Sequence, residues 1–85
     1  MDDSSVLRNR VREVRERLQM RQADLAEAAG VTRQTILAIE KGRLNPSVSV
    51  SLKIAKALRE PTDYVFYLES RPEEDNEPPA VFDFV

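Results

Sequence analysis

The stretch from Gln22 to Gly42, QADLAEAAGVTRQTILAIEKG, decides how this chain folds. Its apolar spacing predicts two short helices joined by a tight turn, the first running from about Gln22 to Ala28. Gly30 stands where a left-handed residue can end that helix, because glycine has no Cβ to clash. Thr32 can then cap the second helix by accepting a hydrogen bond from an early backbone N–H. We therefore expect two helices packed around this turn.

The second expected helix spans residues 33–41, with Ile36 and Ile39 pointing inward. Its outward face carries donor-rich polar side chains and one small residue: Arg33, Gln34, Thr35 and Ala38. Arginine and glutamine can each pair with a base edge in the major groove, arginine with guanine and glutamine with adenine. We expect this face to contact bases of double-stranded DNA; plain solvent exposure is the alternative.

The composition limits what the chain can do chemically. With 85 residues it is one small domain, and it contains no cysteine and no histidine. Disulfides and thiolate metal sites are therefore excluded, no zinc or calcium motif is present, and we expect neither a metal nor a cofactor. The carboxylates are scattered, so an enzyme has little support. No secretory signal or membrane-length apolar run is seen, which favours a cytoplasmic protein.

The net charge of −2 is unevenly distributed. Residues 1–71 hold all 13 Lys and Arg against 10 Asp and Glu, a net charge of +3. Residues 72–85 hold five carboxylates and no basic residue: Glu73, Glu74, Asp75, Glu77 and Asp83. Phosphate affinity depends on local rather than total charge, so a basic body remains compatible with binding nucleic acid.

The flanking segments are also predicted to be helical. Residues 5–18 carry an apolar stripe at helical spacing, formed by Leu7, Val11, Val14 and Leu18. A helix over residues 48–58, capped by Ser47, has an expected inner stripe of Val48, Leu52, Ala55 and Leu58, backed by Ile54, and an outer solvated face with Lys53 and Lys56. A short fifth helix is expected over residues 63–68, with Thr62 as its cap.

These expectations add up to an all-α, compact five-helix domain over residues 1–68. An acidic, proline-containing tail follows over residues 69–85 and ends in the apolar hexapeptide AVFDFV. Its composition is typical of an unfolded, solubilising segment. Folding back over the basic surface as a mimic of DNA is an alternative use of its charge.

Several segments together resemble the phage-repressor and Cro-like (XRE-type) family of helix-turn-helix transcriptional regulators, especially its short stand-alone members. The matching segments are QADLA at 22–26, GVTRQTI at 30–36, IEKG at 39–42, NPS at 45–47 and LKIA at 52–55. The resemblance spans roughly Leu7 to Leu68 and leaves the terminal 17 residues outside. It implies a lambda-repressor-like fold and a protein of the prokaryotic nucleoid.

The resemblance also implies roles for individual residues. The base contacts would come from Arg33, Gln34, Thr35 and Ala38, and phosphates would be held by Arg21, Gln22, Thr32, Lys41, Arg43 and Asn45. For the loop residues Arg43 and Asn45, a simple cap and turn is an equal alternative. Arg15 and Glu40 match positions that form a buried ion pair in the family, which is structural because a buried charge requires its partner.

The function implied is that of a transcriptional regulator, expected to be a repressor that binds an inverted-repeat operator as a homodimer. The expected dimer surface is aromatic and apolar: Tyr64, Phe66, Tyr67, Val81, Phe82 and Phe84. An antitoxin or protein-interaction module, whose segment Ala80–Val85 binds a partner protein, is the alternative function.

Overall fold

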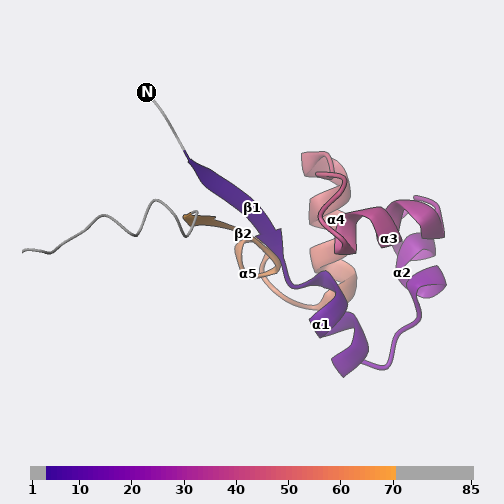
Figure 1. The fold of residues 1–85 in the computed structure, drawn as a ribbon. Helices are drawn as coiled ribbons and strands as arrows, with labels where there is room; N and C mark the ends of the chain where they lie inside the picture. Colours follow the sequence, from indigo (N-terminus) through magenta and orange to yellow (C-terminus); the bar gives the residue numbers. More distant parts are fainter. Residues whose placement is uncertain (1–3, 71–85) are drawn as a thin grey trace, which may run out of the picture.

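The computed structural model describes residues 4–70, which form five helices beside a two-stranded sheet (Figure 1). The elements, in chain order, are β1 (Ser5–Asn9), α1 (Val11–Arg17), α2 (Gln22–Ala29), α3 (Arg33–Glu40), α4 (Val48–Leu58), α5 (Thr62–Val65) and β2 (Phe66–Ser70). Helices α1 to α4 surround the core, and the two strands project from that body at the end where α5 lies. Among residues 4–70, none of the helices combines the length and hydropathy that a membrane span requires.

The central pair of helices forms as predicted, to within one residue at each end. Gly30 adopts the left-handed conformation with φ +71°, and the Val31 amide donates to the Ala26 carbonyl at 3.0 Å, which closes α2. The Thr32 side chain accepts a hydrogen bond from the Thr35 amide at 3.1 Å and so caps α3. Both signals act within a few residues, which is why the sequence reveals them.

A single apolar cluster holds the helices together. Its buried members are Val11, Val14, Leu25, Ala26, Ala29, Ile36, Ile39, Ile54, Ala55, Leu58 and Val65. Every helix contributes to it, and burial of such side chains stabilises the fold by about 1.5–3 kcal/mol each for the larger ones.

The helix expected over residues 5–18 is wrong in its first half. Residues 5–9 form strand β1, and α1 covers only Val11–Arg17. Asn9 makes the break: its side-chain carbonyl accepts from the Val11 amide at 3.1 Å, and its side-chain amide donates to the Ile39 carbonyl at 3.0 Å. Of the expected stripe, Val11 and Val14 are buried, while Leu7 lies on the strand and Leu18 is exposed.

The fifth helix is also shorter than expected, so the all-α prediction is wrong. Helix α5 ends at Val65 with Pro61, not Thr62, at its N-cap, and residues 66–70 form β2. Strands β1 and β2 pair antiparallel in the register Ser5↔Ser70, Val6↔Glu69, Leu7↔Leu68, Arg8↔Tyr67 and Asn9↔Phe66. Aromatic and β-branched side chains favour strands once a partner is present. Strand β2 also continues past the boundary expected after Leu68.

Helix α4 has the predicted bounds and cap, and three of the residues expected inside, Ile54, Ala55 and Leu58, are buried. The Ser47 side chain accepts from the Val50 amide at 3.2 Å. Val48 and Leu52, expected inside, are 76% and 52% exposed. The buried arc runs from Ile54 over Leu58 to Ala55, and Val48 and Leu52 lie beyond its Ala55 edge. A helix buries one arc only, and the apolar pattern of α4 is too wide to show which one.

Candidate nucleic-acid interface

A buried ion pair fixes α3 against the rest of the body. Arg15 Nε donates to Glu40 Oε2 at 2.7 Å, and the two side chains are 11% and 3% exposed. Arg15 Nη1 also donates to the Met20 carbonyl at 2.8 Å. The pair implied by the family resemblance is therefore present, and it ties α1 to the last turn of α3 and to the segment before α2.

The Gln22 side chain belongs to the same network. Its amide Nε2 donates to Glu40 Oε1 at 3.1 Å, and the residue is half-buried at the start of α2. The sequence-based expectation placed this amide on a DNA phosphate. In the free protein it instead joins α2 to α3, so a phosphate contact requires the amide to exchange partners or use its remaining N–H.

The start of α3 exposes Arg33 and Gln34 to solvent. Thr32 and Thr35 share a hydroxyl–hydroxyl hydrogen bond of 3.0 Å, and Thr35 is only half exposed. Ala38, one turn further along, is half-buried as well. Of the four expected base-contacting residues, the first two are therefore the most accessible, and the other two form the flank of the same face.

Backbone hydrogen bonds to the last turn of α3 fix the start of the loop that follows this helix. Gly42 is left-handed with φ +76°, and the Arg43 amide donates to the Ala38 carbonyl at 2.9 Å. This six-residue closure uses glycine where a side chain would be strained. It fixes the backbone of a loop whose side chains are exposed: Lys41, Arg43 and Asn45.

Some cations of residues 4–70 form ion pairs with carboxylates and others do not. Five arginines pair with carboxylates: Arg8 with Glu69, Arg12 with Glu16, Arg15 with Glu40, Arg17 with Glu60 and Arg21 with Asp24. The expected phosphate ligand Arg21 is thus occupied by Asp24, which it contacts at 3.1 Å. Among the described residues, the cations without an ion pair on α3 and its following loop are Arg33, Lys41 and Arg43. These three remain available to phosphates and bases, and together with the exposed Gln34 they form what we call the α3 surface.

The aromatic residues expected at a dimer surface are largely used within the subunit. The Arg10 guanidinium lies 4.4 Å from the ring centre of Tyr64 and 4.2 Å from that of Tyr67, and it donates to the Tyr64 carbonyl at 2.6 Å. Phe66 packs against the core. The other expected residues, Val81, Phe82 and Phe84, lie outside the described part of the chain.

Sequence reasoning missed the roles of Asn9 and Arg10. Asn9 anchors the β1–α1 junction to α3, and Arg10 joins that junction to α5 and β2. Asparagine before an apolar helix is a recognised start signal, and it could have moved the predicted start of the helix from Ser5 to the residues after Asn9. No local signal announces the stacking of Arg10, because its partners lie more than 50 residues away.

Comparison with known proteins identifies the family to which this chain belongs. The family model described as helix-turn-helix matches residues 11–65, more than half of the chain. The chain belongs to the helix-turn-helix family. The match covers the ion pair, the capped α3 and the loop after it, and it excludes both strands.

Relatives with this arrangement occur in archaea and bacteria. An HTH-type transcriptional regulator of Methanothermobacter thermautotrophicus is 48% identical over 64 residues, which cover 74% of this chain and 93% of that protein. The HTH-type transcriptional regulator YgzD of Bacillus subtilis is 48% identical over 63 residues, covering 74% and 96%. The restriction-modification controller protein C.AhdI of Aeromonas hydrophila has a similar structure, with a TM-score of 0.62 and 33% identity over 65% of this chain and 83% of that one.

Proposed function

We propose that this helix-turn-helix protein is a sequence-specific, double-stranded DNA-binding regulator of transcription that acts as a repressor and reads the major groove with α3. Family membership supports DNA-binding regulation of transcription as the class of function. The observation that carries the finer proposal is the exposure of Arg33 and Gln34 at the capped start of a helix that a buried ion pair holds in place.

The chemistry of that face suits direct base readout. Arg33 can donate two hydrogen bonds to guanine O6 and N7, and Gln34 can pair with adenine N6 and N7. No acidic residue occupies the first turn of α3, so its N-terminus keeps its positive dipole end for a phosphate. Lys41 and Arg43 lie at the other end of α3, where they would contact the backbone of the duplex.

The protein is proposed to act as a homodimer on an inverted repeat. One α3 reads only a few base pairs, and a module of this size buries too little surface for strong specificity. Two copies would place their α3 helices in successive major grooves about 34 Å apart. An exposed apolar residue on the projecting sheet, Leu68, is 65% exposed and supplies surface for such contact.

Selection of bound sites from random DNA tests this function, because the recovered sequences report symmetry and spacing together. Arg33→Ala should reduce discrimination at one base position of each half-site by about 1–3 kcal/mol. Arg43→Ala should weaken all sequences alike and flatten the salt dependence of binding. Equal losses of both variants on selected and random DNA would contradict this division between base and phosphate contacts.

A further inference from the structure

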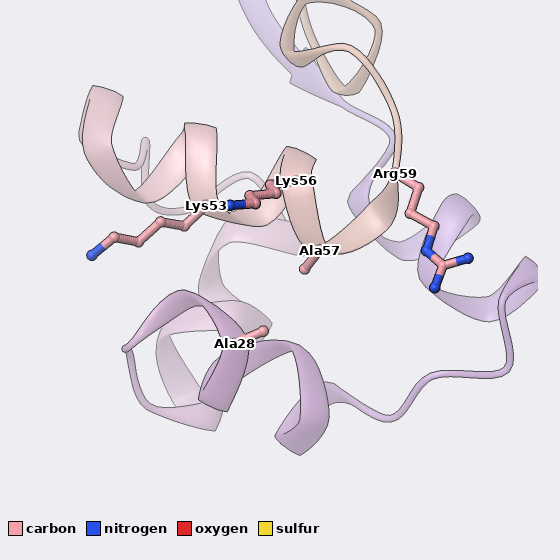
Figure 2. A pocket seen from close by; sticks show the side chains of 5 residues that line it. All are labelled: Ala28, Lys53, Lys56, Ala57 and Arg59. Atoms are coloured by element: carbon pink, nitrogen blue, oxygen red, sulfur yellow. The ribbon is translucent and has the colours of Figure 1, made fainter.

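A hollow of about 510 Å³ lies between the end of α2 and the second half of α4. Figure 2 shows its lining: Ala28 and Ala57 come from the two helices and face each other, Lys53 extends to one side of them, and Arg59 lies on the opposite side. The lining residues are Ala28, Lys53, Lys56, Ala57 and Arg59, and none belongs to α3. We call this hollow the α2–α4 groove.

The three cations of the α2–α4 groove have no carboxylate partner among residues 4–70. Lys53 and Lys56 are three residues apart on α4, so their charges repel, and Arg59 follows at the left-handed C-cap of the same helix. Most other cations of the described chain are paired with carboxylates or belong to the α3 surface. The groove therefore combines an apolar floor of two alanines with unneutralised positive charge.

The complementary chemistry is present at the end of the same chain. Residues 72–85 carry five carboxylates and no cation, and their last six residues, AVFDFV, hold four large apolar side chains around one aspartate. Small alanine side chains leave room for bulky apolar groups, and lysine and arginine attract the carboxylates. The groove thus matches both properties of this segment.

The segment is also long enough to reach the groove. Fifteen residues follow Ser70, and at 3.3–3.6 Å per residue they can span up to about 50 Å. A small domain is about 30 Å across. Ala80, where the apolar end begins, lies ten residues after Ser70 and can therefore be up to about 35 Å from it, which is enough to cross a domain of this width and reach the groove of its own subunit.

We propose that residues 72–85 dock in the α2–α4 groove of their own chain. Docking neutralises Lys53, Lys56 and Arg59 and leaves, among residues 4–70, only Arg33, Lys41, Arg43 and the ring-stacked Arg10 without a carboxylate partner. If the proposed function holds, non-specific attraction of phosphates is then confined to the α3 surface. The docking itself requires no DNA, so it can fail or succeed independently of that function.

Zero-length carbodiimide coupling of the full-length protein tests the proposal, because the chain has only three lysines: Lys41, Lys53 and Lys56. Two lie in the groove and the third, on the α3 surface, is the internal control. We expect coupling of Lys53 or Lys56 to Glu73, Glu74, Asp75, Glu77 or Asp83, identified by mass spectrometry and reduced in high salt. Coupling to Lys41 instead would mean that the segment covers the α3 surface, and no coupling to any lysine would mean that it does not dock; either overturns the proposal.

Mixing ¹⁴N- and ¹⁵N-labelled protein before coupling shows whether the docked segment belongs to the same chain as the groove or to a second copy. Coupled peptide pairs of a single isotope are expected, whereas mixed pairs would assign the segment to a second copy and overturn docking within one chain.

A variant that neutralises the five carboxylates to Gln and Asn supplies a second measurement that leaves the core untouched. The ¹⁵N amide signals of Ala28 and Ala57 should shift relative to the natural protein, and that of Gln34 should not. Shifts confined to α3, or no shift at all, would contradict the docking.

Discussion

The carboxylate of Glu40 shows how much a single residue can fix in this protein. It accepts hydrogen bonds from Arg15 on α1 and Gln22 on α2, while its own backbone ends α3. The orientation of the proposed reading helix therefore depends on one buried ion pair. Removing one charge leaves the other without a partner in a buried place, which costs far more than the pair itself is worth.

Arg15→Met alone should lower the free energy of unfolding by about 3–5 kcal/mol. The double variant Arg15→Met, Glu40→Leu should recover most of that loss, because no charge is left buried. Arg12→Met is the matched control: its pair with Glu16 is exposed, at 3.0 Å, and its loss should change the free energy of unfolding far less than Arg15→Met does. Urea denaturation of the four proteins measures these differences, and a double variant no better than Arg15→Met would contradict the argument.

Asp24 offers a pH-dependent test at the same scale. Hydrogen bonds from the Arg21 guanidinium and from the Arg21 backbone amide, at 3.1–3.2 Å, lower the pKa of the Asp24 carboxyl. A carboxyl with a lowered pKa stabilises the fold above its unfolded pKa and loses that contribution as the pH falls through its folded value. NMR titration should show the pKa of Asp24 rising toward its ordinary value in Arg21→Gln.

The same linkage predicts how Asp24→Asn behaves. Its melting temperature should lie below that of the natural protein at pH 7, and the difference should shrink as the pH is lowered and the natural carboxyl becomes protonated. A difference that stays constant from pH 7 to acid pH would show that charge is not the cause.

At the scale of elements, helices α1 to α4 are each followed by a residue with positive φ. That residue is glycine after two of the helices and a residue with a side chain after the other two. Helices α2 and α3 close with Gly30 and Gly42 at positive φ, whereas the positive-φ residues after α1 and α4 are Gln19 (φ 57°) and Arg59 (φ 61°). A side chain in the left-handed region costs roughly 1–2 kcal/mol, which glycine avoids. The second of these strained residues supplies a cation of the α2–α4 groove.

Arg59→Gly should therefore raise the free energy of unfolding by about 1 kcal/mol, even though it removes a side chain. Gln19→Gly is the matched control, since it relieves the same strain at a helix end far from the groove in sequence. Chemical denaturation measures both. Destabilisation by Arg59→Gly together with stabilisation by Gln19→Gly would show that the contacts of the Arg59 side chain outweigh the strain.

At the scale of the whole molecule, the most exposed large apolar side chains among the described residues lie on two elements. One is strand β2 of the projecting sheet, where Leu68 pairs with Leu7, and the other is α4, with Val48 and Leu52. A two-stranded sheet is marginally stable in water without further packing. The sheet is for that reason the better surface for a second copy.

Leu68→Glu should accordingly convert the proposed dimer into a monomer and weaken binding to an inverted repeat, while binding to a half-site changes little. Leu52→Glu is the matched control, because it places the same charge on the exposed side of α4. Sedimentation equilibrium reports the mass of each variant, and circular dichroism checks that the helices remain. Dissociation by Leu52→Glu alone would place the dimer contact on α4.

The amino-acid sequence by itself determines the centre of this protein, residues 22–42, and the accessible pair Arg33 and Gln34. Caps, left-handed glycines and helical spacing act within one or two turns, so they can be read locally. Tertiary structure alone decided the rest: residues 5–9 became a strand only because residues 66–70 pair with them. It likewise chose which arc of α4 is buried and which cations stay free, because each depends on partners distant in the sequence.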